Sequence, residues 1–133
     1  MIYVTDTYPL TLHLLDKHKK LGAQARRIYD RVVQEKAVIV IPTICLVEIM
    51  ELTEVGKLRL AYSLKAIIHM LKRSRFYQIE PLTEDIVLTA SNIPLIREER
   101  DRLIVATALT LDYPLITSDQ WVIESRLVET VWE

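Results

Sequence analysis

The 133-residue chain has little glycine, little cysteine and no long apolar run, and each shortage excludes a class of protein. With only two glycines, the chain has little from which to build a glycine-rich phosphate-binding loop. Cys45, the single cysteine, cannot form an intrachain disulfide, which is compatible with a reducing cytoplasm. No apolar stretch approaches the roughly 18 residues of a membrane-spanning helix, and the N-terminus shows no signal-peptide pattern. We therefore expect a soluble, cytoplasmic protein with no membrane association.

The charges are nearly balanced, which leaves nucleic-acid binding to be argued from the position of particular residues. The chain carries 17 basic and 18 acidic side chains, for a formal net charge of −1. The total charge therefore does not indicate a nucleic-acid binder, although a local basic patch remains compatible with it. Half of the residues are apolar, and the length suits a single domain, residues 1–133, with a sizeable core.

Short apolar runs that alternate with helical patterns predict an α/β fold. Five runs are predicted to be strands, at residues 2–5, 37–41, 77–79, 114–117 and 127–132. Two of them, 37–41 and 114–117, are continuously apolar, which favours strands covered on both faces, as in a parallel sheet. Helices are expected at residues 21–33 and 60–71, from about Pro42, and at 100–111. This alternation indicates βαβ units with right-handed crossovers.

Four carboxylates fall where this topology brings them to one edge of the sheet. Asp6 and Asp119 follow the first and fourth predicted strands, and open parallel sheets bind ligands beyond the carboxyl ends of their strands. Glu48 lies early in the helix after the second strand. Asp101 begins the helix that leads into the fourth strand and runs antiparallel to it. All four side chains are therefore expected to meet at the same edge.

Carboxylates that crowd together repel one another and lose their protons reluctantly. A divalent cation resolves this conflict, and hard cations such as Mg²⁺ and Mn²⁺ prefer oxygen ligands. A cation held in this way can activate water and stabilise charge on a phosphodiester. The pattern therefore suggests hydrolysis that leaves a 5′-phosphate, with the cation also needed to bind the polyanion.

Each carboxylate also has an ordinary structural interpretation. Asp6 and Asp119 could cap helices, and Asp101 could favour a helix dipole. Glu48 is harder to explain in this way, because its neighbours in the sequence are mostly apolar. The combination of the four acids is more specific than any one of them.

Several segments carry a resemblance to a known family. An apolar strand ends in Asp-Thr at residues 2–7, and a helix with a glutamate occupies residues 42–49. The segment 101–108 reads Asp-Arg-Leu-Ile-Val-Ala-Thr-Ala, the strand at 115–119 ends in a fourth acid, and Val131-Trp132 follow. In these segments the chain resembles the PIN-domain family, and within it the VapC toxins, over essentially its whole length.

The resemblance implies a three-layer α/β/α fold with a mostly parallel five-stranded sheet. It also implies an endoribonuclease that uses one or two Mg²⁺ or Mn²⁺ ions to cut single-stranded RNA. The catalytic, metal-binding acids of the family are carried over to Asp6, Glu48, Asp101 and Asp119. Thr117 and Ser118 would help to position water or metal. Toxins of this family commonly form homodimers and are blocked by a cognate VapB-type antitoxin.

One segment departs from the pattern of the family. Many of the toxins have His-x-Asp-Pro-x-Asp-Arg, whereas residues 96–102 read Ile-Arg-Glu-Glu-Arg-Asp-Arg. Ile96 replaces the histidine, Glu98 replaces the first aspartate, and the proline is missing, which puts the loop geometry and the choice of substrate in doubt. Arg102 remains and is expected to contact phosphate or orient the acids, because arginine binds planar oxyanions well.

Three hypotheses stay open at this point. The chain could be an endoribonuclease toxin, a PIN-fold ribonuclease of RNA maturation or decay without an antitoxin, or a catalytically inactive PIN binding module. An antitoxin gene immediately upstream would separate the first two, and retention of all four acids argues against the third. A haloacid-type phosphatase is rejected, because that chemistry needs Asp-x-Asp and Tyr8 occupies the second position after Asp6.

Overall fold

A sheet of five parallel strands runs through the molecule, and the computed structural model describes all 133 residues. The strands are β1 (Ile2–Thr5), β2 (Val38–Pro42), β3 (Tyr77–Glu80), β4 (Leu115–Ile116) and β5 (Thr130–Val131). Their order across the sheet is β3-β2-β1-β4-β5, and every neighbouring pair is parallel. The α/β class and the parallel sheet predicted from the sequence are confirmed.

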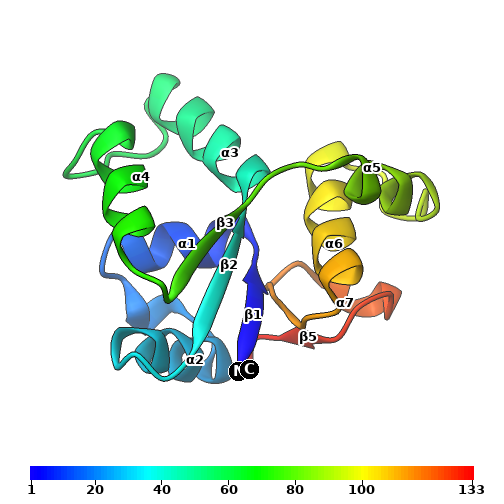
Figure 1. The fold of residues 1–133 in the computed structure, drawn as a ribbon, viewed down its shortest axis with the longest axis horizontal. Helices are drawn as coiled ribbons and strands as arrows, with labels where there is room; N and C mark the ends of the chain where they lie inside the picture. Colours follow the sequence, from blue (N-terminus) through cyan, green and yellow to red (C-terminus); the bar gives the residue numbers. More distant parts are fainter.

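Helices cover both faces of the sheet. On one side lie α1 (Thr7–Leu14), α2 (Ala23–Val33), α3 (Thr43–Glu54) and α4 (Leu64–Arg73), together with the short 3-10 helix η1 (His18–Lys20) (Figure 1). On the other side lie α5 (Glu84–Ser91), α6 (Glu99–Leu111) and α7 (Gln120–Ser125) (Figure 1). Right-handed crossovers explain this division, because the chain first moves from β1 toward β3 and then turns back toward β5. The fold is the three-layer α/β/α arrangement that the resemblance implied.

The direction of the chain across the sheet reverses beside β1. Val4 of this strand pairs with Val40 of β2 on one side and with Leu115 of β4 on the other. The helices that follow β1 and β4 consequently leave toward opposite faces of the sheet, which opens a crevice at the carboxyl ends of these strands. Ligands of doubly wound α/β proteins bind at such a switch point. The residues that follow Thr5 and Ile116 are therefore in the position where a site is expected.

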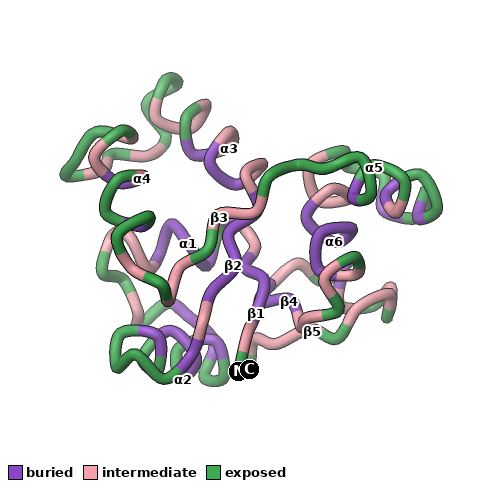
Figure 2. The backbone as a smooth tube through the Cα atoms, in the orientation of Figure 1, coloured by how far each residue is buried: buried purple, intermediate pink, exposed green.

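The core lies on both faces of the central strands. Val4, Ile39, Ile41 and Ile116 are completely buried, which explains why β2 and β4 are continuously apolar in sequence. Burial concentrates in β1, β2 and the inward side of α6 (Figure 2). The small side chains of α6 allow this helix to pack closely on the sheet. No helix combines the length and the apolar character that crossing a membrane requires.

Several elements differ from their predicted bounds. β5 covers only 130–131 instead of 127–132, although Leu127 and Val128 still pack against the core. α4 begins at Leu64 rather than near residue 60, because the hydroxyl of Ser63 accepts a hydrogen bond from the Ala66 amide and caps the helix. α5 was not predicted, since only Ile86 and Ala90 of its eight residues are buried and the apolar periodicity is weak.

Candidate metal centre

The structure brings the four predicted acids to the carboxyl edge of the sheet. Asp6 follows β1, Asp119 follows β4 by three residues, and each is the N-cap of the next helix. Asp101 lies in the first turn of α6. Asp6 and Asp119 therefore do cap helices, as their ordinary structural interpretation predicted. They do so at the same edge of the sheet where the four carboxylates gather. All four acids are partly buried.

Asp6 is held by hydrogen bonds to both of its carboxylate oxygens. Oδ1 accepts from the Thr7 amide at 2.8 Å, and Oδ2 accepts from the Thr117 hydroxyl at 2.7 Å. Burial is the main cause that raises the pKa of Asp6, and the charges of Asp119 and Glu98 add to this effect. The two hydrogen bonds act in the opposite direction and lower this pKa, but the net shift is upward.

Glu48 extends from α3 toward the same position. Its Oε1 accepts a hydrogen bond of 2.6 Å from the hydroxyl of Thr7, which is itself buried. Burial raises the pKa of Glu48, and the charge of Asp6 raises it further. Thr7 therefore contacts two acids at once, through its amide to Asp6 and through its hydroxyl to Glu48. From the sequence, Thr7 is identified only as a member of the Asp-Thr pair, and no role is predicted for its side chain.

Asp101 has four acidic neighbours whose charges act on its carboxyl. Its pKa rises from 3.8 to about 7, first because the carboxyl is partly buried and then because of neighbouring carboxylates. These neighbours are, in order of effect, Asp6, Glu98, Asp119 and Glu48. No protein group donates a hydrogen bond to the Asp101 carboxylate, so nothing in the chain offsets this repulsion.

Asp119 uses one oxygen as a helix cap and leaves the other free. Oδ1 accepts from the amides of Trp121 at 2.9 Å and Val122 at 3.3 Å. Its own amide donates to the Thr117 hydroxyl at 3.1 Å. Thr117 thereby connects the acids that follow β1 and β4. Ser118 makes no side-chain hydrogen bond. That Thr117 and Ser118 position water or metal stays a prediction.

Glu98 is a fifth acid that the sequence did not assign to the site. Its Oε2 accepts a hydrogen bond of 2.8 Å from the Asp101 amide, so it caps α6. Its charge raises the pKa of Asp6, Glu48 and Asp101. A signal was available in the sequence, because Glu98 stands where many VapC toxins have their first aspartate of this segment.

The arginines beside Asp101 are engaged with protein groups. Arg102 donates from Nε to the carbonyl of Ile96 at 2.7 Å and from Nη2 to that of Pro94 at 3.5 Å. Its guanidinium thus supports the segment before α6 and makes no contact with the four acids, unlike the phosphate-binding or orienting role expected for it. Arg100 forms a bidentate ion pair with Glu51 and so links α6 to α3.

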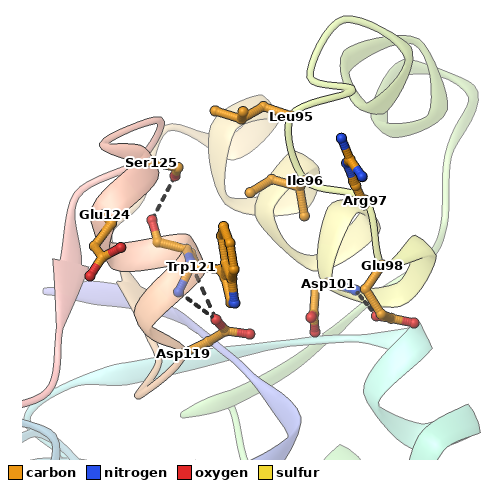
Figure 3. Close-up of a pocket in the computed structure, with 10 residues that line it drawn as sticks. Leu95, Ile96, Arg97, Glu98, Asp101, Asp119, Trp121, Glu124 and Ser125 are labelled. Carbon is orange, nitrogen blue, oxygen red and sulfur yellow. Dashed lines mark hydrogen bonds between the residues drawn. The ribbon is translucent and has the colours of Figure 1, made fainter.

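Two adjoining hollows define the space around the acids. A small one of about 240 Å³ is lined by residues that include Asp6, Thr7, Glu48 and Asp101. A larger one of about 700 Å³ lies beside it and includes Asp101 and Asp119 (Figure 3). Asp101 borders both hollows. As the side chains stand, no three acidic, histidine or cysteine side chains converge closely enough to ligate one ion, so binding would require side-chain adjustment.

The donor set nevertheless has the chemistry of a hard-cation site. The acids and Thr7 supply carboxylate and hydroxyl oxygens to these hollows, and Mg²⁺ and Mn²⁺ prefer such ligands. Burial first and neighbouring carboxylates second raise the pKa of Asp6, Glu48 and Asp101, and a bound cation would offset the repulsion among these carboxylates. The side chains present therefore fit a divalent cation, with Asp101 as the least constrained member.

The sequence profile of the PIN domain matches residues 3–122. The chain belongs to the PIN-domain family.

Several solved structures share this fold, each at 17% sequence identity. VapBC2 from Rickettsia felis, bound to a DNA fragment from its promoter, has a TM-score of 0.68 with 100% of both chains covered. FitAcB from Neisseria gonorrhoeae has a TM-score of 0.63 with 98% of this chain and 96% of that chain covered. A toxin–antitoxin complex from Klebsiella pneumoniae has a TM-score of 0.62 with 97% and 95% covered. No curated protein shows significant sequence similarity.

Proposed function

We propose that this protein is a metal-dependent endoribonuclease that cuts single-stranded RNA and serves as the toxin of a type II toxin–antitoxin pair in the cytoplasm. The observation that carries the proposal is the gathering of Asp6, Glu48, Asp101 and Asp119 around adjoining hollows at the switch point, where burial and neighbouring charges raise the pKa of Asp6, Glu48 and Asp101. A fold gains no stability from assembling like charges in this way. Such an arrangement is explained by a ligand of opposite charge that binds there.

The residues that would hold Mg²⁺ or Mn²⁺ are Asp6, Glu48, Asp101 and Asp119. One or two such ions, when bound, supply a nucleophile from water and stabilise the charge on the phosphodiester. The chain provides the arrangement of the ligands. Thr7 and Thr117 hold the carboxylates of Asp6 and Glu48 in place through hydrogen bonds of 2.6 to 2.8 Å, which limits the reorganisation that binding requires.

The acids also determine how RNA can approach. The site is bordered by five carboxylates, counting Glu98, and this density of charge repels a polyanion. Substrate binding therefore depends on the cation. The pKa of Asp101 is raised to about 7, so cation binding near neutral pH competes with a proton on this carboxyl. Cleavage is accordingly expected to require metal and to weaken at acidic pH.

The toxin assignment is supported by the proteins that share the fold. Three of them are toxin–antitoxin complexes or VapBC assemblies, and each is covered over nearly its whole length by this chain. We therefore propose a VapB-type antitoxin as the partner and a homodimer as the oligomeric state. An antitoxin gene directly upstream would support this part of the proposal independently of catalysis.

Cleavage of a mixed pool of single-stranded RNA tests the activity. The pool is incubated with Mg²⁺, with Mn²⁺ and with chelator, using wild type, Asp6→Asn and the matched control Asp85→Asn, which changes an aspartate on the remote helix α5. We expect metal-dependent products with 5′-phosphates from wild type and the control, and at least about a 100-fold loss in Asp6→Asn. Products with 2′,3′-cyclic phosphates would contradict hydrolysis by water.

Metal binding can be measured without catalysis. Titration calorimetry with Mn²⁺ is expected to show binding to wild type and Asp85→Asn, and at least about a 10-fold weaker affinity for Asp101→Asn. A folded protein that binds Mn²⁺ but cuts no RNA would favour the binding-module hypothesis. A protein that binds no Mn²⁺ would contradict the metal centre itself.

A further inference from the structure

An exposed tryptophan stands directly beside the acids. The side chain of Trp121 is 83% exposed, and Leu95, on the segment before α6, is 68% exposed. Both line the 700 Å³ cavity that Asp101 and Asp119 also border. In Figure 3 the indole is seen nearly edge-on, with Leu95 and Ile96 above it and the aspartates below. An apolar patch of this kind next to a charged site marks a binding surface.

The fold holds this indole in a defined position relative to the acidic site. The Trp121 amide donates to Oδ1 of Asp119 at 2.9 Å, so the acid and the indole are two residues apart on one capped helix. Val122, the next residue, is 3% exposed and anchors α7 in the core. Because Val122 faces inward, Trp121 is directed away from the core. The tryptophan therefore has no packing role that would account for it.

The opposite wall of the cavity carries a single cation. Arg97 is the only basic residue among those that line the cavity, and it forms no ion pair in the structure. The segment that presents it is held by Arg102, which donates to the carbonyls of Ile96 and Pro94. Figure 3 shows the Arg97 guanidinium beside Ile96, across the cavity from Trp121. The cavity thus offers an aromatic face, an apolar wall and a positive charge that forms no ion pair.

We infer that this cavity is a nucleobase subsite, in which a base next to the scissile phosphate stacks on Trp121 while Arg97 contacts a neighbouring phosphate. The inference rests on the proposed function and adds a substrate-binding residue to it. A base has a flat neutral face that suits an indole, and stacking of this type is tolerant of sequence. The volume is within the range of small-ligand sites, and Asp101 connects the cavity to the acids.

The geometry favours RNA over a protein segment as the occupant. An RNA strand whose phosphate lies at the acids must continue into one of the two hollows, and the larger one adjoins Asp101 and Asp119. The only exposed aromatic ring in that hollow is Trp121, which a splayed base can reach and a paired base cannot. The subsite therefore gives a physical reason for preferring single-stranded RNA.

The test measures binding separately from cleavage. A 5′-fluorescein-labelled, mixed-sequence, single-stranded RNA of about 12 nucleotides, a length within the range of single-strand binding sites, is titrated by anisotropy in the presence of Mg²⁺. The parent protein is Asp6→Asn, which is expected not to cut the probe. Trp121→Ala, Trp121→Phe and Tyr62→Ala are each added to it. Tyr62 is the matched control, because it is an aromatic residue that is 63% exposed just before α4, on the other side of the sheet.

We expect Trp121→Ala to weaken binding by about 10-fold, Trp121→Phe to stay within about threefold, and Tyr62→Ala to leave the affinity unchanged. RNA is also expected to quench the fluorescence of Asp6→Asn more than that of its Trp121→Phe derivative, since the second tryptophan, Trp132, lies elsewhere. The annealed duplex of the same probe should bind more weakly than the single strand.

If the Trp121→Ala and Tyr62→Ala proteins bind RNA with equal affinity, the subsite is overturned. This conclusion holds even if wild type cleaves RNA. Because Asp6→Asn removes one of the proposed metal ligands, RNA binding is also measured for wild type in Mg²⁺, and absence of binding by both proteins overturns the subsite. An arginine-rich peptide is titrated in the same way. If Trp121→Ala weakens the binding of this peptide but not the binding of RNA, the cavity binds a protein partner and the inference is overturned. Cleavage by wild type, measured in parallel, decides the proposed function on its own. Trp121-dependent RNA binding without cleavage supports the subsite and contradicts only the nuclease.

Discussion

The hydroxyl of Thr117 donates a hydrogen bond of 2.7 Å to Oδ2 of Asp6 and thereby joins the ends of two neighbouring strands across 111 positions of sequence. The same hydroxyl accepts from the amide of Asp119. Thr117 is completely buried, so water cannot replace either bond. One side chain thus sets the distance between two of the acids, and several properties of the site should depend on it.

Replacing Thr117 by valine keeps its shape and removes both hydrogen bonds. We expect Thr117→Val to lower the free energy of unfolding by about 1–3 kcal/mol, because a buried carboxylate loses a donor. The affinity for Mn²⁺ should fall by about 10-fold, as for other residues that orient metal ligands. Urea unfolding and titration calorimetry measure the two effects. Thr117→Ser, which retains the hydroxyl, is the control, and equal behaviour of all three proteins would refute the positioning role.

The raised pKa of Asp101 predicts an unusual dependence of stability on pH. Between 3.8 and about 7 the folded state holds a proton that the unfolded state has lost. The metal-free protein therefore becomes less stable as pH rises through this window. His13, whose pKa is lowered from 6.5 to about 4 by burial and by His18, has the opposite effect, because its contribution is lost as pH falls.

The Asp101→Asn variant separates these two contributions. Its melting temperature relative to wild type should increase from about pH 5 to about pH 8, because only wild type acquires a repelled charge over that range. His13 is present in both proteins and cancels in the difference. Scanning calorimetry in chelator gives the measurement. A difference that does not change with pH would contradict the crowding of the carboxylates. Adding Mn²⁺ should stabilise wild type more at the alkaline end.

Gly22 is required by a close approach of the backbone rather than by its torsion angles. A Cβ atom at this position would lie 2.3 Å from the carbonyl oxygen of Trp132, which accepts hydrogen bonds from the amides of Gln24 and Ala25. We expect Gly22→Ala to destabilise the fold by about 1–3 kcal/mol in urea unfolding.

Gly56→Ala is the comparison for Gly22→Ala. Gly56 has a φ of 76° and open space around the position of a Cβ, so its cost should come from the left-handed backbone and be about 1 kcal/mol. A neutral effect of Gly22→Ala would mean that the C-terminal residues are free to move away from α2.

Tyr29 connects the core to the strand that carries Asp6. Its hydroxyl lies 2.5 Å from Oγ1 of Thr5, and the ring is completely buried. Tyr29→Phe should cost about 1 kcal/mol of stability without changing Mn²⁺ affinity, because Thr5 still donates to the carbonyl of Asp6. Tyr113→Phe is the control, since the Tyr113 hydroxyl forms no hydrogen bond. A loss of metal affinity in Tyr29→Phe would instead place Tyr29 in the support of the site.

The arrangement of the acids could be anticipated from the sequence because it follows from topology. Asp6 and Asp119 end parallel strands, and the helix that starts near Asp101 enters the sheet from its carboxyl edge. Once β1 and β4 are recognised as neighbours, these carboxylates must meet. Thr7 and Glu98 could not be identified in the same way, because their roles depend on the direction of one hydroxyl and one carboxylate.

Arg102 illustrates the limit of reasoning from residue type. The sequence suggested a phosphate contact or a role in orienting the acids, because arginine binds oxyanions and this residue follows an acid. In the structure its guanidinium donates to two carbonyls of the segment 94–96. The guanidinium donors suit an oxyanion and a backbone carbonyl equally well, and only the local path of the backbone decides which of the two they contact. The free cation at the site is Arg97, five residues earlier in the chain.

Periodicity in the sequence by itself determined the layers of this protein, because continuous apolar strands must be covered on both faces and crossovers between parallel strands have one hand. It also determined which edge would carry the acids. Tertiary structure alone decided how near those acids lie and how strongly they repel. It also decided which hydroxyls hold them and that Trp121 stands exposed beside Asp119. These properties depend on burial and on side-chain direction to within a few ångströms, and no spacing of residues along the chain encodes them.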